Sequence, residues 1–238
     1  MSFTRPHHQE ISIILDQFDS DYLRQNNILF GGGTRIALEL NEFRESVDID
    51  LFCIGQASYR AARSEVTNTS FGKLFKPGCN PERHANKDIR ADRDAIRALL
   101  AGTHSRIKLE IINFSNSELL PGEKNPLFPI DCVSKEGCFA SKLTANADRY
   151  LNHHKDIIDL CMMRKSWGNI TCRSWEIAFK EYGRSTILSS LKSSLERIKD
   201  NSEAFDIAVN SLNMDESTAS EIICQYASAW LEELTDTH

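Results

Sequence analysis

Three consecutive glycines, Gly31, Gly32 and Gly33, stand between two apolar runs and constrain the fold more than any other feature of the chain. The first run, residues 28–30, predicts a buried strand, and residues 34–40 predict a helix that begins just after the glycines. Because glycine has no side chain, the backbone N–H groups of such a turn can approach a bulky anion closely. The positive N-terminal end of the helix points to the same place. This order of strand, glycine turn and helix therefore predicts a phosphate-binding turn.

The second apolar run, residues 47–54, predicts a strand that carries Asp48 and Asp50. Successive strand residues face opposite sides of a sheet, so these two carboxylates share one face. They repel each other unless a cation neutralises them, and hard divalent ions prefer oxygen ligands. A glycine run alone is typical of a tight turn, and alternating aspartates are common on solvated strands. Their order here, beside the apolar Ile49 and Leu51, favours nucleotide chemistry at adjoining phosphate and metal sites.

The stretch GGGTRIALELNEFRESVDIDLF, residues 31–52, resembles the first motif of polymerase-β-type nucleotidyltransferases, in the branch of the AbiEii/AbiGii abortive-infection toxins. That branch shows a Gly-Gly-Thr turn, a short helix and then Arg-x-Ser-x-Asp-x-Asp-Leu-Phe. The matching residues here are Gly32, Gly33, Thr34, Arg44, Ser46, Asp48, Asp50, Leu51 and Phe52. The resemblance implies that the glycines, Thr34 and Ser46 bind the nucleotide, and that the two aspartates are catalytic and bind metal.

Residues 106–113 alternate apolar and polar side chains and predict a strand that carries Glu110. This strand could lie beside the acidic strand in the same sheet. Nucleotidyl transfer commonly uses two metal ions, and holding both takes more than two carboxylates. The resemblance implies that Glu110 is the third catalytic and metal-binding carboxylate, at a position where family members often carry Asp. The alternative is an exposed strand glutamate that pairs with Lys108 or Arg106.

A second motif lies in the C-terminal half, where Lys142 is followed by the run KDIIDL at residues 155–160. It resembles the family's downstream motif, a lysine followed by Arg-Asp-x-x-Asp-Leu. Lys155 replaces the arginine, which keeps the charge and loses the bidentate geometry. The resemblance implies that Lys142 contacts the phosphates of the nucleotide and that Asp156 orients the nucleotide or its partner side chains. Both are candidate catalytic residues, and without the first motif they would be ordinary charges on helix surfaces.

The remaining pattern predicts a mixed α/β N-terminal half and a helical C-terminal half. Helices are expected over residues 9–25, 34–40, 56–70 and 91–101, the last with a strand in part of it as the alternative. Segments 71–86 and 115–129 are expected to be loop-rich, the second as a linker. Further helices are expected near 134–150, 153–165, 172–183, 185–199, 203–212 and 216–234.

The expected fold class is α/β (α+β), a nucleotidyltransferase-fold mixed sheet with flanking helices, followed by a helical half. We expect a catalytic domain at residues 1–130 and a helical domain at 131–238 that completes the cleft for nucleotide and acceptor. The apolar runs are shorter than the roughly 20 residues that cross a bilayer, and the N-terminal residues lack the apolar core of a signal peptide. We therefore expect a cytoplasmic protein without membrane contact. The seven cysteines include no CxxC pair and are expected to be free thiols.

The net charge of −6 argues against a protein that coats nucleic acid with its whole surface. One local basic segment remains, because Arg83, Lys87, Arg90, Arg93 and Arg97 lie close together in sequence. Two interpretations of this segment are open. It is either a solvated face with ion pairs or a contact to nucleic acid.

These patterns and the resemblance predict a Mg²⁺-dependent nucleotidyltransferase, with Mn²⁺ as the alternative ion, that moves an NMP from an NTP to an acceptor hydroxyl. The resemblance further implies tRNA or other RNA as the acceptor. It also implies a toxin of a bacterial toxin–antitoxin or phage-defence pair, with a cognate antitoxin protein as partner. Two alternatives stay open: a catalytically silent nucleotide- or protein-binding module, and nucleotidylation of a protein or small molecule. A basic acceptor groove would favour RNA, and an acidic one a cationic small molecule.

Overall fold

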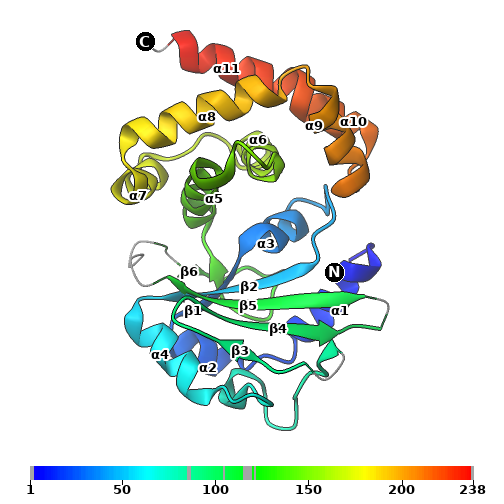
Figure 1. Ribbon diagram of the computed structural model, residues 1–238, viewed down its shortest axis with the longest axis vertical. Coiled ribbons are helices and arrows are strands. Elements are labelled where there is room, and N and C mark those ends of the chain that lie inside the picture. The colour runs from blue at the N-terminus through cyan, green and yellow to red at the C-terminus, as the bar shows by residue number, and fades with distance from the viewer. Residues whose placement is uncertain (1–2, 85–86, 104, 115–119, 121, 237–238) are drawn as a thin grey trace. The chain divides into compact units, whose positions relative to one another are not determined.

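The computed structural model describes residues 3–84, 87–103, 105–114, 120 and 122–236 (Figure 1). Backbone contacts divide the chain into two compact units. Unit 1 comprises Met1–Glu42 and Ser46–Ser134, and unit 2 comprises Phe43–Glu45 and Lys135–His238. The short segment Phe43–Glu45 thus belongs to the unit that is built mainly from the C-terminal half of the sequence.

Unit 1 is built on a seven-stranded mixed sheet in the order β3-β4-β5-β2-β1-β7-β6. Its strands are β1 (Ile28–Gly31), β2 (Asp48–Ile54), β3 (Arg90–Ala91), β4 (Ala95–Ala101), β5 (Arg106–Phe114), β6 (Gly122–Glu123) and β7 (Cys132–Val133). Strand β2 is central, antiparallel to β1 and parallel to β5, so the two strands expected to carry carboxylates are direct neighbours. The mixed sheet with helices confirms the expected fold class.

The helices of unit 1 are α1 (Pro6–Leu15), α2 (Ser20–Gln25), α3 (Gly32–Glu39), α4 (Gln56–Glu65) and the short 3₁₀ helix η1 (Gly72–Leu74). The single helix expected over residues 9–25 is therefore two helices. Proline begins α1, where its missing N–H costs no helical hydrogen bond. The side chain of Asp19 caps α2 by accepting the N–H groups of Asp21 and Tyr22, so the chain turns there and starts a new helix.

The core of unit 1 lies on one face of the sheet. Alternate residues of β2 and β5, such as Ile49 and Leu109, are fully buried there against side chains of α1, α2 and α4. Figure 1 shows α2 and α4 on this side of the sheet and α3 on the other. Because strand side chains alternate, Asp48, Asp50 and Glu110 project from the opposite face. The hydrophobic pattern thus fixes which face carries the acidic residues.

The helix expected over residues 91–101 is wrong, because most of this segment forms strand β4. Its sequence is rich in alanine and leucine, which favour helices in isolation. Ile96 and Leu100 nevertheless alternate with the less buried Arg97 and Leu99, and β4 pairs along its whole length with β5. Tertiary pairing here outweighs local propensity. The strand expected in part of this segment was the correct alternative.

Unit 2 is helical, as the sequence predicted for this half. Its elements are α5 (Lys135–Arg149), α6 (Lys155–Trp167), α7 (Cys172–Tyr182), α8 (Arg184–Ile198), α9 (Ser202–Asp206), η3 (Ile207–Ser211), α10 (Glu216–Ser220), η4 (Glu221–Tyr226) and α11 (Ala227–Asp236). The turns η3 and η4 are π-helical. Side chains of Thr171, Asn201 and Asp215 cap helix starts.

The expected linker over residues 115–129 falls partly on residues 115–119 and 121, which lie outside the described part of the chain. The same holds for residues 85–86 of the expected loop. None of the described helices is long and apolar enough to span a bilayer.

Candidate active site

The candidate site begins with two aspartates on the open face of β2. Asp50 is in register with Gly31 of β1 on one side and with Glu110 of β5 on the other. Asp48 is in register with Lys108 of β5. Registered neighbours in a sheet point to the same side, so the three carboxylates predicted from the sequence share one face. The structure therefore brings Asp48, Asp50 and Glu110 onto neighbouring strands.

The glycine turn lies directly against the second aspartate. Gly32 has a φ angle of +70°, which glycine adopts readily and other residues rarely do. A Cβ atom built on Gly32 would overlap Oδ2 of Asp50 and lie 2.8 Å from its Cβ. A Cβ atom on Gly31 would lie 3.0 Å from the ring of Phe52. The absence of side chains on this turn is thus what lets its backbone reach the carboxylate of Asp50.

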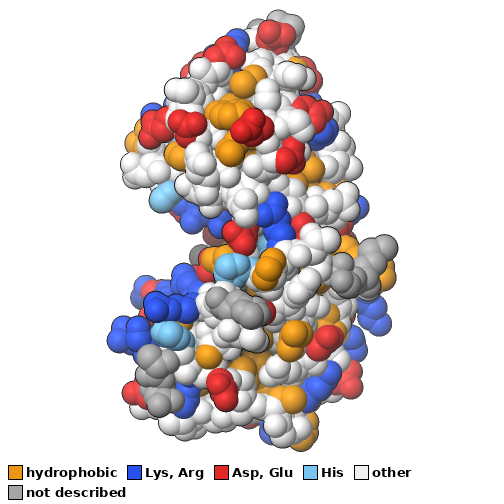
Figure 2. Space-filling model, turned by 90° about the vertical axis from the view of Figure 1, so that its right-hand side faces the viewer, with side chains coloured by type: hydrophobic (Ala, Val, Ile, Leu, Met, Phe, Trp, Pro, Cys, Tyr) orange, Lys and Arg blue, Asp and Glu red, His pale blue; other side chains and the backbone are white. Residues whose placement is uncertain are grey.

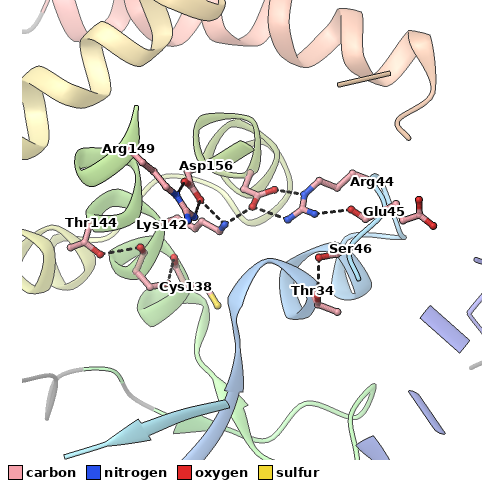
Figure 3. A network of polar contacts seen from close by, with 11 residues as sticks. Thr34, Arg44, Glu45, Ser46, Cys138, Lys142, Thr144, Arg149 and Asp156 are labelled. Atoms are coloured by element: carbon pink, nitrogen blue, oxygen red, sulfur yellow. Dashed lines mark hydrogen bonds and ion pairs between the residues drawn. The ribbon is translucent and has the colours of Figure 1, made fainter. Parts of the chain in front are cut away.

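Two buried hydroxyl groups connect helix α3 to the start of β2 (Figure 3). Oγ1 of Thr34 lies 2.7 Å from Oγ of Ser46 and also donates to the backbone carbonyl of Asp48. Thr34 is fully buried and Ser46 is 4% exposed. These bonds fix the backbone that presents Asp48 next to the first turn of α3. Direct contact of either hydroxyl with a nucleotide stays a prediction.

A histidine from α1 supports the same segment. Nδ1 of His8 lies 2.8 Å from Oε1 of Glu42, and Nε2 accepts the backbone N–H of Ser46 at 3.1 Å. Since Nε2 accepts, the ring carries its proton on Nδ1 and donates it to the glutamate. Glu42 has a φ angle of +54° and also accepts the backbone N–H groups of Thr4 and Arg5. The N-terminal segment therefore holds a strained loop that leads into the acidic strand.

Hydrogen bonds keep the carboxylate of Glu42 ionised. Burial alone would raise its pKa, but the bonds from Thr4, Arg5 and His8 lower the pKa to about 2. Sequence reasoning missed His8 and Glu42, because neither stands in a recognisable spacing to the glycine turn or the aspartates. Only the folded chain brings residues 34 positions apart into contact.

Glu110 shares the face of the aspartates but has cationic partners of its own. Its Oε1 lies 3.0 Å from Nε of Arg97, and its Oε2 lies 2.6 Å from Nζ of Lys108. The pairing with Lys108 is the one that the sequence left open as an alternative. The role of Glu110 as a third metal ligand stays a prediction.

The donor set fits a hard divalent cation through two residues. Asp48 and Asp50 offer carboxylate oxygens on one face beside the glycine turn. Within the described residues, no three His, Cys, Asp or Glu side chains gather to hold a metal on their own. Mg²⁺ is usually bound by one or two carboxylates together with phosphate oxygens of the substrate, rather than by a cage made wholly of protein. The two aspartates match that arrangement.

A second polar network lies in unit 2 and joins the two sequence motifs (Figure 3). Arg44 makes two hydrogen bonds to Asp159, from Nε at 2.6 Å and from Nη2 at 2.9 Å. Nζ of Lys142 lies 2.8 Å from Asp156 and 2.7 Å from Asp159. Arg149 donates through two nitrogens to Asp156. Cations and carboxylates therefore alternate from Arg44 to Arg149.

Burial and charge act against each other in this network. Burial would raise the pKa of Asp156 and Asp159, but the neighbouring Lys142, Arg149 and Arg44 lower both. Burial would likewise lower the pKa of Lys142, and the two carboxylates raise it. All three groups are held in their charged forms, and the side chain of Lys142 is only 7% exposed. Its contact with nucleotide phosphates, and the orienting role of Asp156, stay predictions.

Comparisons with known proteins identify the family and the fold. Residues 13–223 match the family described as nucleotidyl transferase AbiEii toxin, type IV toxin–antitoxin system. JHP933 from Helicobacter pylori has a similar structure, with a TM-score of 0.55, 18% identity, and coverage of 99% of this chain and 96% of that one. A second H. pylori protein, provisionally named a nucleotidyltransferase, gives a TM-score of 0.54 at 19% identity, with 98% and 96% covered. A search of curated proteins gives no match. At these identities the two structures show the fold, and the family match over most of the sequence shows that the chain belongs to the AbiEii nucleotidyltransferase toxin family.

Proposed function

We propose that this protein transfers an NMP from a nucleoside triphosphate to an acceptor hydroxyl, and that the acceptor is RNA, with tRNA as the expected class. The observation that carries the proposal is the approach of the Gly32 backbone to the carboxylate of Asp50. A turn that can take phosphates and a carboxylate that can take a divalent cation lie side by side there. This arrangement suits a nucleotide whose phosphates carry a bound metal.

The residues of unit 1 divide the work. Backbone N–H groups of Gly32 and Gly33, at the start of α3, hold the phosphates of the triphosphate. Asp48 and Asp50 hold Mg²⁺, or Mn²⁺ as the alternative, which when bound polarises the α-phosphate and stabilises the charge of the leaving group. The acceptor oxygen forms a bond to the α-phosphorus, and the bond from that phosphorus to the pyrophosphate oxygen breaks. A carboxylate of the pair accepts the proton of the acceptor hydroxyl.

Membership in a type IV toxin–antitoxin family implies an antitoxin as partner. The position of Glu110 supports an active enzyme over a silent binding module, because it faces the same side of the sheet as the two aspartates. The helical unit as the second wall of the cleft, and the cytoplasm as the location, stay predictions. The roles of Lys142 and Asp156 of unit 2 in binding the nucleotide also stay predictions.

The test is transfer of label from each NTP, labelled at the α-phosphate, in the presence of Mg²⁺ and total bacterial RNA. The matched control variant is Asp48→Asn, which keeps the shape of the side chain and removes its charge. Labelled RNA with the wild-type protein, and no labelled RNA with Asp48→Asn, supports the proposal and identifies the base that is transferred. Label on protein, or no transfer together with no nucleotide binding by calorimetry, contradicts it.

A further inference from the structure

Four basic side chains lie on the same face of the sheet as the catalytic aspartates. Arg97 of β4 is in register with Glu110, which is itself in register with Asp50. Arg90 of β3 is in register with Arg97. Lys108 is in register with Asp48, and Arg106 precedes it by two residues on the same face of β5. We call Arg90, Arg97, Arg106 and Lys108 the basic row.

The basic row extends from the edge of the sheet to the aspartates. Strand β3 is the outermost strand on this side, and β2 is three strands away. With neighbouring strands about 4.8 Å apart, the row covers roughly 14 Å between Arg90 and Asp50. It is therefore a track on a surface rather than an enclosed pocket.

The row is open to solvent and keeps an excess of positive charge. Arg90 and Arg106 are exposed, and the side chains of Arg97 and Lys108 are 43% and 46% exposed. Glu110 and Asp92 are the carboxylates paired with Arg97, and Glu110 also pairs with Lys108. Figure 2 shows Lys and Arg side chains gathered on one side of unit 1. A negatively charged protein thus carries a local basic surface next to its carboxylates.

We propose that the basic row binds the phosphates of a polynucleotide acceptor and leads its reactive end to Asp48 and Asp50. This inference rests on the proposed function for the identity of the reaction, but the binding that it predicts can be measured without transfer. Phosphate contacts position a nucleic acid without reading its sequence, and arginine and lysine at intervals along a surface are suited to that role. Arg90 belongs to the segment whose two interpretations the sequence left open.

The extent of the row argues for a polymer rather than for a second mononucleotide. The phosphates of an NTP are accounted for by the glycine turn, which adjoins Asp50 on the side of β1. The basic row lies on the other side of Asp50, on strands β5, β4 and β3. A ligand that contacts Arg90 and also reaches the aspartates needs several successive charges, as the backbone of single-stranded RNA supplies.

The test compares two double variants with the same change of charge. Arg90→Gln with Arg106→Gln alters the exposed ends of the row and leaves the partners of Glu110 in place. Arg60→Gln with Arg63→Gln, on α4, alters exposed arginines of a helix that packs on the core face of the sheet. Binding of a short single-stranded RNA with a free 3′-hydroxyl is followed by fluorescence anisotropy at several salt concentrations. Binding of each NTP is followed by calorimetry, and folding by thermal unfolding.

We expect the row variant to bind RNA about tenfold more weakly and to lower the slope of log K against log salt by about 1.4, since each single-strand phosphate contact contributes about 0.7. NTP binding and the unfolding midpoint should stay at wild-type values, and the α4 variant should bind RNA normally. Equal losses in both variants, no loss in the row variant, or no RNA binding by the wild type would each overturn the proposal. RNA that binds through the row without accepting label would contradict the proposed function and leave the row as a binding site.

Discussion

The backbone of Gly32 approaches the carboxylate of Asp50 so closely that no side chain fits between them. A Cβ atom at position 32 would lie 2.7 Å from Cγ of Asp50, and the φ angle of +70° is itself unfavourable for any other residue. Gly32 is the first residue of α3 and directly follows Gly31, the residue of β1 that pairs with Asp50 of β2. The geometry of the glycine turn and that of the Asp50 carboxylate are therefore coupled.

We predict that Gly32→Ala lowers the transfer rate by about 100-fold, because the added carbon displaces Asp50 by a fraction of an ångström or more. Gly55→Ala is the matched control. Gly55 also has a positive φ, +87°, but a Cβ atom there meets nothing within 4 Å. Both variants carry backbone strain, and only the first should lose activity. Equal transfer rates for Gly32→Ala and Gly55→Ala would show that the close approach of the glycine turn to Asp50 is not needed for catalysis.

His8 should act as a positioning residue. We predict that His8→Leu lowers kcat about tenfold with little change in KM for the NTP, because the backbone N–H of Ser46 loses its acceptor near the start of β2. Thr4→Val is the control, since Thr4 bonds to Glu42 but not to Ser46. That variant should lose stability and keep kcat. A KM increase in His8→Leu without a fall in kcat would contradict the positioning role.

The buried pair of Arg44 and Asp159 should be important for stability. We predict that Asp159→Asn destabilises the chain by about 3 kcal/mol, because it leaves the fully buried guanidinium of Arg44 without its counter-charge. Glu221→Gln is the comparison, since its ion pair with Lys165 is exposed and should contribute less than about 1 kcal/mol. Urea unfolding of the full chain measures both. Similar midpoints for the two variants would show that the buried pair contributes little.

Acid should destabilise the protein through carboxyl groups with a lowered pKa, among them three that take part in the networks around Ser46 and Lys142. The pKa values of Glu42, Asp156 and Asp159 are lower than their ordinary values of 4.5 and 3.8, and that of Glu42 falls to about 2. A lowered pKa stabilises the folded chain above the ordinary value, and this stabilisation is lost as the pH falls through the folded value. We therefore expect the urea midpoint to decline from about pH 4.5 downward. In the variant Glu42→Gln the urea midpoint should decline less steeply as the pH falls. A decline as steep as that of the wild type would exclude Glu42 as a contributor.

Local pattern was enough to predict the acidic strand and the glycine turn. Alternation of apolar and polar residues fixed the common face of Asp48 and Asp50, because burial of Ile49 and Leu51 leaves only one side for the carboxylates. The helices of the C-terminal half followed in the same way from their apolar spacing. The same method went wrong at β4, where alanine and leucine favour a helix and the decisive term is pairing with β5.

Contacts between distant residues could not be predicted from one sequence. The motif residues Arg44 and Asp159 were each recognised, but nothing in their spacing says that they pair across 115 positions. The cationic partners of Glu110 were only partly foreseen. Lys108 was named from its place on the same strand, whereas Arg97 comes from a segment that was expected to be helical. The support by His8 depends on a turn of the chain that no local pattern encodes.

The segment Phe43–Glu45 can pack in its final place only after a much later part of the chain has been synthesised. The chain enters unit 2 at residue 43, returns to unit 1 at residue 46 and enters unit 2 again at residue 135. Arg44 therefore leaves the ribosome long before Asp159 exists, and its buried environment cannot form until α6 has been made. Until then, the loop between α3 and β2 lacks the hydrogen bonds from Arg44 to Asp159. A chain built in this way cannot complete the segment that leads into Asp48 until α6 has been made.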